Sequence, residues 1–143
     1  MRAPLSLAVF MLLLGSVVCT PANNLVDEEA SPYHGTCAEV LNTLQQVIAK
    51  RNASLIKDLF PEEFFYMGCK SILKRDQFAH SLSILPDDIT VTFQPRYHYT
   101  AGTLVVCNAD MVEHFGETTH YYLVQCLVDG PSSTIFRAKR FTC

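Results

Sequence analysis

The sequence predicts an α+β domain whose helices pack in the concave side of a strongly curved antiparallel sheet. Apolar residues recur at helical spacing over residues 36–51, whereas from residue 89 onward they alternate with polar residues, as strands do. Turn residues divide that second region at "TAGT", "GE" and "DGPSS". Helices placed before such a meander of strands favour a sheet wrapped around the first helix.

The N-terminal end has the features of a secretory signal peptide over residues 1–19. Arg2 supplies a positive charge, an apolar run follows, and small residues then allow cleavage after Cys19 or after Ala22. The apolar run is too short to span a bilayer, so no membrane association is expected once this segment is removed. We therefore expect a secreted, extracellular protein, with a retained signal anchor as the alternative.

An extended polar leader over residues 20–35 is expected to precede one domain over residues 36–143. Without the signal peptide, ten Lys and Arg residues stand against fourteen Asp and Glu residues, which argues against nucleic acid as a partner. No Cys-x-x-Cys or Cys/His ligand spacing occurs, so neither a metal nor a cofactor is expected. Asn52 in "NAS" is an N-glycosylation acceptor and predicts an exposed loop.

The helices are predicted from their stripes and caps. Thr36 and Glu39 fit a capping box at the start of the first helix. Its apolar stripe comprises Cys37, Val40, Leu41, Leu44, Val47 and Ile48. A short second helix is expected to begin at Ser54 and to end at Pro61, and a short aromatic strand follows at residues 64–66. The buried side of a third helix comprises Phe78, Leu82 and Leu85.

In the meander, Pro95 favours a bulge or an edge position in the first long strand. The "GE" turn puts glycine at the first central position of a type II′ turn, so Phe115 faces Thr118. The same register sets Cys107 opposite Cys126, and a disulfide between them is predicted because Cα atoms about 5.5 Å apart are bridgeable. Residues 137–140, "RAKR", are interpreted as a solvated, basic strand edge.

The remaining cysteines make an odd number, because Cys19 is expected to leave with the signal peptide. Cys37, Cys69 and Cys143 have no pairing that the sequence assigns. One cysteine is therefore either free or bonded to another chain. A homodimer would form through that cysteine or through the mixed outer face of the sheet.

The register also tests whether the polar residues of "VVCNADMVEHFGETTHYYLVQC" form a catalytic group. Asp110 and His114 lie about 13 Å apart on one strand, at about 3.3 Å per residue. A hydrogen-bonded acid–base pair needs about 3 Å. His120 projects to the opposite face, which also carries Cys107 and Cys126 and is apolar enough to be the core side. We therefore expect no catalytic dyad or triad among these residues.

The chain resembles the nuclear transport factor 2-like superfamily, a cystatin-like cone fold that includes ketosteroid isomerase, scytalone dehydratase and the SnoaL-like cyclases. The resemblance is carried by the helix at residues 36–51, by "DLFPEEFFYMG" and "KRDQFAHSL", and by the hairpins after residue 88. Small secreted members with several cysteines, common in nematodes, look most similar. The resemblance implies a cone with a ligand pocket or a filled core, and dimers through the sheet are frequent.

The leading hypothesis is a non-catalytic secreted domain that binds a small apolar ligand or a protein partner. The residues expected to line its pocket are Phe64, Tyr66, Phe78, Phe93, Tyr97 and Tyr122. A second hypothesis is a cofactor-free isomerase, dehydratase or cyclase with a single cavity carboxylate. In that case the resemblance to the isomerase implies Asp110 as base and Tyr121 as donor. A third, a cystatin-type protease inhibitor, is disfavoured because "QPRYHYTAG" lacks the QxVxG spacing and the chain has no Trp.

Overall fold

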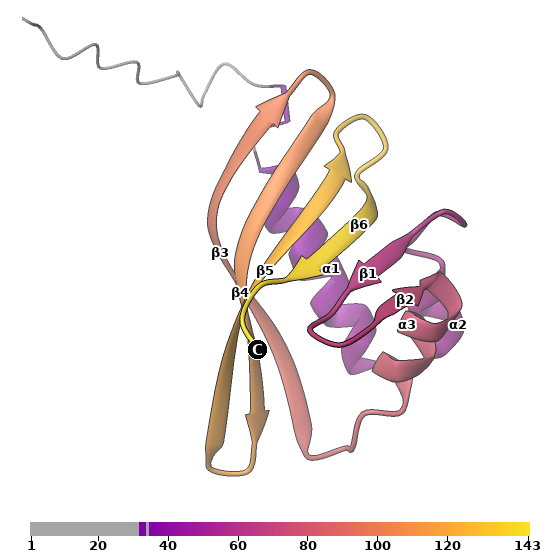
Figure 1. The fold of residues 1–143 in the computed structure, drawn as a ribbon, viewed down its shortest axis with the longest axis vertical. Coiled ribbons are helices and arrows are strands. Elements are labelled where there is room, and N and C mark those ends of the chain that lie inside the picture. The colour runs from indigo at the N-terminus through magenta and orange to yellow at the C-terminus, as the bar shows by residue number, and fades with distance from the viewer. Residues whose placement is uncertain (1–31, 34) are drawn as a thin grey trace, which may run out of the picture.

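The computed structural model describes residues 32, 33 and 35–143; the predicted signal peptide and nearly all of the leader lie outside this part. Two helices, two short strands and a third helix precede a long C-terminal meander (Figure 1). In chain order the elements are α1 (Thr36–Ala49), α2 (Ala53–Lys57), β1 (Phe65–Met67), β2 (Ile72–Lys74), α3 (Arg75–Ser83), β3 (Ile89–Ala101), β4 (Leu104–Phe115), β5 (Thr118–Asp129) and β6 (Thr134–Arg140). Within this part of the chain, no helix is long and apolar enough to cross a membrane.

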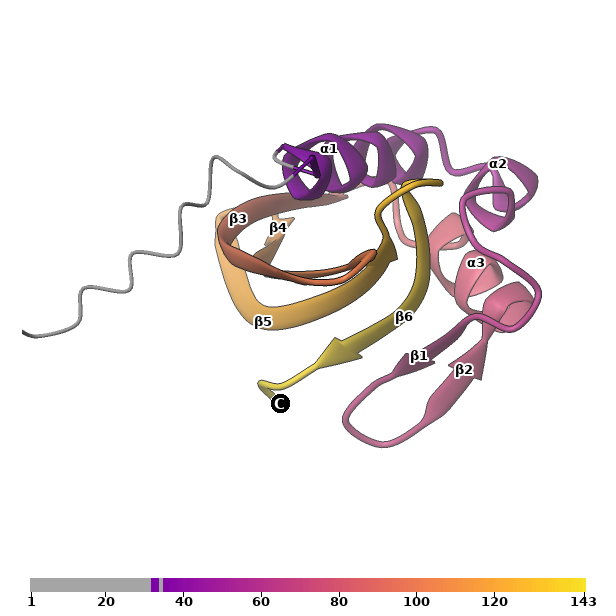
Figure 2. The ribbon, with the colours of Figure 1, turned by 90° about the horizontal axis from the view of Figure 1, so that it is seen from above.

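The strands form one six-stranded sheet in the order β2-β1-β6-β5-β4-β3. The sheet curls around one side of the molecule without closing, and α1 lies across its concave opening (Figure 2). This arrangement confirms the predicted fold class. The prediction of a wholly antiparallel sheet is wrong at one pair, because β1 runs parallel to β6. The strand β2, which pairs with β1, was not predicted.

The predicted register of the meander is confirmed. Phe115 pairs with Thr118 and Cys107 pairs with Cys126 across β4 and β5. Gly116 has φ 55°, in the left-handed region that the first central position of the predicted turn requires. The register between β3 and β4 shifts just after Pro95, where a bulge was expected. Local alternation and turn chemistry therefore suffice to align these strands.

The hydrophobic core lies between α1 and the concave face of the sheet. The predicted stripe of α1 is buried except for the half-buried Val47: Leu41, Leu44 and Ile48 are each 4% exposed or less. They pack against side chains of β3 to β6, among them Val91, Val105, Val124, Val128 and Ile135. The outer face is less solvated than expected, because Val106, Asn108 and Val112 are also buried there.

The helix caps differ from the predicted ones. Gly35, with φ 90°, is the N-cap of α1, and no side chain caps that helix, so the capping box at Thr36 is wrong. The side-chain oxygen of Asn52, rather than Ser54, caps α2 by accepting hydrogen bonds from the backbone N–H groups of Ser54 and Leu55. α2 ends at Lys57, before Pro61.

The cysteines pair differently from the prediction. Cys37 bonds to Cys107 with Cα atoms 5.6 Å apart, and Cys69 bonds to Cys143 with Cα atoms 5.8 Å apart. Cys126 is free and buried. The predicted Cys107–Cys126 disulfide is wrong because α1 crosses the face that both side chains share, and its first turn brings Cys37 to Cys107. The predicted dimer through an unpaired cysteine stays a prediction.

Candidate functional site

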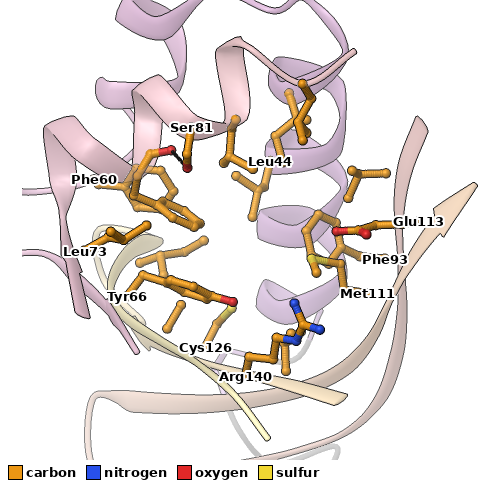
Figure 3. A pocket seen from close by; sticks show the side chains of 18 residues that line it. Leu44, Phe60, Tyr66, Leu73, Ser81, Phe93, Met111, Glu113, Cys126 and Arg140 are labelled. Carbon is orange, nitrogen blue, oxygen red and sulfur yellow. Dashed lines mark hydrogen bonds between the residues drawn. The ribbon is translucent and has the colours of Figure 1, made fainter. Parts of the chain in front are cut away.

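An apolar cavity of about 200 Å³ lies between α1, α3 and the concave face of the sheet (Figure 3). Its walls come from elements far apart in the chain. The apolar lining includes Leu44 and Ile48 of α1, Phe78 and Leu82 of α3, Val91 of β3 and Val124 of β5. The cavity is the site at which the curved sheet and the helices leave a space that their side chains do not fill.

Aromatic rings form the wall of the cavity nearest α3. Tyr66 stacks on Phe78 with ring centroids 4.7 Å apart, and Phe60 meets Phe78 edge-on at 5.5 Å. Phe64 packs behind them, 4.2 Å from the ring of Phe60, and is only 1% exposed. Offset and edge-to-face contacts of this kind stabilise a rigid wall beyond their burial alone. The wall is therefore pre-formed.

The charged side chains of the cavity come from β4 and β6, and the Tyr66 hydroxyl lies beside Arg140 (Figure 3). Tyr66 from β1, Glu113 from β4 and Arg140 from β6 all line the cavity (Figure 3). Arg140 donates from Nε to the carbonyl oxygen of Thr142 at 2.8 Å, and its guanidinium carbon lies 3.5 Å from the ring centroid of Tyr122. Burial raises the pKa of the Tyr66 hydroxyl above its ordinary value, although a hydrogen bond and the positive charge of Arg140 act in the opposite direction.

Cys126 lies in the cavity wall near the Tyr66 hydroxyl (Figure 3). Burial raises the pKa of its thiol to about 12. A thiol acts as a nucleophile only as the thiolate, and reactive cysteines have lowered pKa values. Cys126 is therefore an inert, apolar part of the wall rather than a catalytic group.

The structure brings together only part of the predicted lining. Tyr66, Phe78 and Phe93 line the cavity. Phe64 lies in the core behind the wall, and Tyr122 contacts the Arg140 guanidinium on the concave face without lining the cavity itself. Tyr97 is 59% exposed on the outer face of the sheet, because the bulge in β3 comes before it and it pairs with the outer-face residue Asn108.

The predicted catalytic pair lies outside the cavity. Asp110 forms an ion pair with Arg96 at 2.7 Å, and Tyr121 is 63% exposed. Both project from the outer face. Each is an odd number of positions from the core-facing cysteine on its own strand, Cys107 for Asp110 and Cys126 for Tyr121, and side chains alternate between faces. Their proposed roles as cavity base and donor are therefore wrong.

The contacts of His114 and His120 are with residues other than Asp110. His114 contacts Thr119 through Nδ1 at 3.2 Å, and His120 stacks on Tyr122 with ring centroids 6.3 Å apart. Among the described residues, no group of three or more His, Cys, Asp or Glu side chains is placed to hold a metal ion.

The sequence analysis missed three polar residues of the site: Ser81, Glu113 and Arg140. Glu113 shares the strand face of Cys107 and Met111, so the predicted register already placed it on the core side. Arg140 was assigned to a solvated strand edge. However, β6 lies between β5 and β1, and the Arg140 side chain lines the cavity. Only the pairing of β1 with β6, which no local pattern indicates, reveals the position of Arg140.

The curved sheet, the helix across its concave side and the cavity between them define an α+β domain of the cone-shaped class. The chain belongs to the NTF2-like family, because the model of the NTF2-like domain matches residues 34–143. This match confirms the family that the sequence resembles. Comparison with curated protein sequences finds no significant match.

Solved structures share the fold at low sequence identity. A substituted form of the protein Rd1NTF2_05 has a TM-score of 0.67 and 11% identity, covering 76% of this chain and 98% of that one. A protein with a ketosteroid isomerase-like fold from Catenulispora acidiphila, solved with trimethylamine, has a TM-score of 0.55 and 16% identity over 73% and 85% of the two chains. An LEH-like epoxide hydrolase from M. tuberculosis has a TM-score of 0.56 and 8% identity over 73% and 80%. These similarities establish the fold alone.

Proposed function

We propose that this protein is a secreted, disulfide-stabilised, non-catalytic domain that binds a small apolar molecule in the cavity. The observation that carries this proposal is the cavity itself, which has aromatic and aliphatic walls and only a few polar side chains in its lining. Concave apolar sites with a few convergent polar groups are typical of small-molecule binding. A cavity of about 150 Å³ lined by Leu, Ile and Phe binds benzene. The volume of about 200 Å³ therefore suits a slightly larger molecule.

Secretion is supported by the covalent structure. Two disulfides are typical of proteins that fold in an oxidising compartment, and they agree with the signal-peptide features of residues 1–19. The exposed position of Asn52 at the start of α2 supports its use as a glycosylation acceptor. The resemblance to small secreted members of the family points the same way. Binding of a protein partner, a dimer through the sheet and protease inhibition stay predictions.

A cavity-filling substitution tests the binding proposal. Ser81 lines the cavity, and its hydroxyl donates only to the Phe78 carbonyl oxygen of its own helix. We expect Ser81→Leu to occupy part of the cavity and to weaken binding of 1-octanol at least about 10-fold, or about 1.4 kcal/mol. Isothermal titration calorimetry with the oxidised protein measures this change.

Ser83→Leu is the matched control. Ser83 makes the equivalent bond to the carbonyl oxygen of His80 but does not line the cavity, so this variant should bind 1-octanol as the wild type does. Absence of saturable binding to the wild type, or equal weakening in both variants, would contradict the proposal. Native mass spectrometry of protein secreted by its source cells provides a second readout, in which an added small-molecule mass is expected.

A second function is favoured by Glu113, a carboxylate that lines the cavity where Asp110 does not. A carboxylate in an apolar site is suited to general base catalysis, and the Tyr66 hydroxyl of the same cavity could act as a donor to the substrate. Such a pair would make the protein a cofactor-free isomerase, dehydratase or cyclase. The fold neighbours include an epoxide hydrolase, whose activity is that protein's own.

Proton exchange distinguishes the two functions. Cyclohexanone is small enough to enter the cavity, and a base beside it would exchange its α-protons for deuterium in D₂O. Under the binding proposal, nuclear magnetic resonance should show the same exchange rate with wild type, with Glu113→Gln and with buffer alone. Faster exchange that Glu113→Gln abolishes would replace the binding proposal by the enzymatic one.

A further inference from the structure

The polar end of the cavity has more hydrogen-bond donors than acceptors. The Arg140 guanidinium and the Tyr66 hydroxyl both lie there, on neighbouring strands β6 and β1. Glu113 is set apart on β4, beyond Met111 (Figure 3). The ion pairs within 4.0 Å among the described residues involve other cations, so Arg140 has no carboxylate partner in this part of the chain. A guanidinium without a carboxylate partner at the end of an apolar cavity favours an anionic ligand group.

The guanidinium is also held in place before any ligand arrives. The Tyr122 ring packs on its face at 3.5 Å, and its Nε donates to the Thr142 carbonyl oxygen at 2.8 Å. These contacts use the face and one nitrogen of the fork. Its terminal nitrogens point toward the cavity, on the side where the guanidinium also meets the Tyr66 hydroxyl (Figure 3). A planar guanidinium held in this way is suited to a bidentate contact with a carboxylate.

The geometry points to a small monocarboxylate as the ligand, with its carboxylate on Arg140 and the Tyr66 hydroxyl and its hydrocarbon part among Phe78, Leu82 and Phe93. This inference rests on the proposed binding function and names the chemical class of the ligand. By comparison with the benzene site above, the volume of about 200 Å³ accommodates about eight to ten non-hydrogen atoms. Octanoate has this size and an anionic head.

Three ligands with the same chain test the inference in the oxidised wild-type protein at pH 7. Octanoate, 1-octanol and octylamine differ at the head group, and calorimetric titration compares their dissociation constants. We expect octanoate to bind at least about 10-fold more tightly than 1-octanol, because a hydrogen bond to a charged group contributes more than one between neutral groups. Octylamine should bind more weakly than either.

The variants assign the preference to Arg140. Arg140→Met should weaken octanoate binding about 10- to 100-fold and change 1-octanol binding less than about 2-fold. Arg137→Met is the matched control: Arg137 stacks on Phe65 at 4.4 Å on the outer face, so its loss removes the same charge without touching the cavity. Arg140→Lys and Tyr66→Phe should each weaken octanoate binding by a smaller factor. These two variants replace Arg140→Met in the titration if that variant does not fold.

The outcomes separate this inference from the proposed function. Equal affinity for octanoate and 1-octanol overturns the inference and leaves apolar binding intact. Tighter binding of octylamine also overturns it, because Glu113 would then select the head group. If none of the three ligands binds, the proposed function fails together with the inference.

Discussion

At the scale of single residues, the face of a strand decides the chemistry of its side chains. Asp110 and Glu113 are carboxylates three positions apart on β4. Asp110 lies on the outer face and pairs with Arg96, whereas Glu113 lies on the concave face and lines the cavity. Successive side chains of a strand alternate between faces, so an odd spacing gives two similar residues different environments.

Replacing Asp110 by Asn should therefore have little effect. The ion pair with Arg96 is partly exposed, with side-chain exposures of 54% for Arg96 and 18% for Asp110. Exposed pairs contribute about 1 kcal/mol or less, so we expect a loss of at most that size in the free energy of unfolding and no change in 1-octanol binding. Urea denaturation and calorimetry measure the two quantities. Weaker binding of 1-octanol to this variant would mean that Asp110 contributes to the cavity, which would contradict its position on the outer face.

Because of Cys126, the free energy of unfolding should depend on pH in the alkaline range. In the unfolded chain its thiol ionises near pH 9.0, whereas burial raises the pKa in the folded state to about 12. The folded state thus holds the proton over a range in which the unfolded state releases it, and stability falls as pH rises above 9.0. We expect a loss of about 1.4 kcal/mol between pH 8 and pH 10 from this group.

Urea denaturation at the two pH values checks this effect, and Cys126→Ala is the control that should lack it. A thiol reagent gives an independent readout on protein lacking the signal peptide. It should label one thiol per chain in denaturant and none in the native state. An identical pH dependence in the alanine variant would contradict the burial of the thiol.

At the scale of elements, the Asn52 side chain both caps α2 and belongs to the predicted N-glycosylation acceptor sequence. The Asn52 side-chain oxygen accepts bonds from Ser54 N–H at 3.0 Å and Leu55 N–H at 3.2 Å. A glycan would be attached to the side-chain nitrogen, which these bonds leave unused. The cap of α2 and glycosylation are therefore compatible at the same residue.

Asn52→Ala should destabilise the protein by about 1 kcal/mol, because it removes the cap of α2. Asn52→Asp keeps an accepting oxygen and should retain most of that stability. Ser54→Ala should abolish glycosylation in secreted protein while it leaves the cap in place. Thermal denaturation of unglycosylated protein and the mass of the secreted protein separate the two roles. Equal stability of the three variants would show that the cap contributes little.

At the scale of the whole molecule, the two disulfides tie opposite ends of the chain to its middle. Cys37–Cys107 joins α1 to β4 across the core, and Cys69–Cys143 joins the loop after β1 to the C-terminal residue. Their sequence separations are 70 and 74 residues, so each should stabilise the fold by about 4 kcal/mol through the unfolded chain.

The more exposed of the two disulfides should be reduced first. Cys69 and Cys143 are exposed, whereas Cys37 and Cys107 are 5% and 1% exposed. A mild reductant should therefore open Cys69–Cys143 first, and peptide mass spectrometry after alkylation identifies the modified cysteines. Alkylation of Cys107 before Cys143 would contradict the position of α1 across the sheet.

The sequence by itself determined the class of the fold, the stripe of α1 and the register of the meander. These features depend on alternation, helical spacing and turn residues within short segments, as the pairing of Phe115 with Thr118 shows. The same register placed Glu113 on the core side, although its role was not recognised.

Only the tertiary structure decided which cysteines pair, that β1 lies beside β6 and that Arg140 ends in the cavity. Each of these facts depends on contacts between segments about 70 residues apart. No local pattern specifies such contacts, because they arise from the packing of helices against the completed sheet. The cavity, whose walls come from both halves of the domain, exists only at that level.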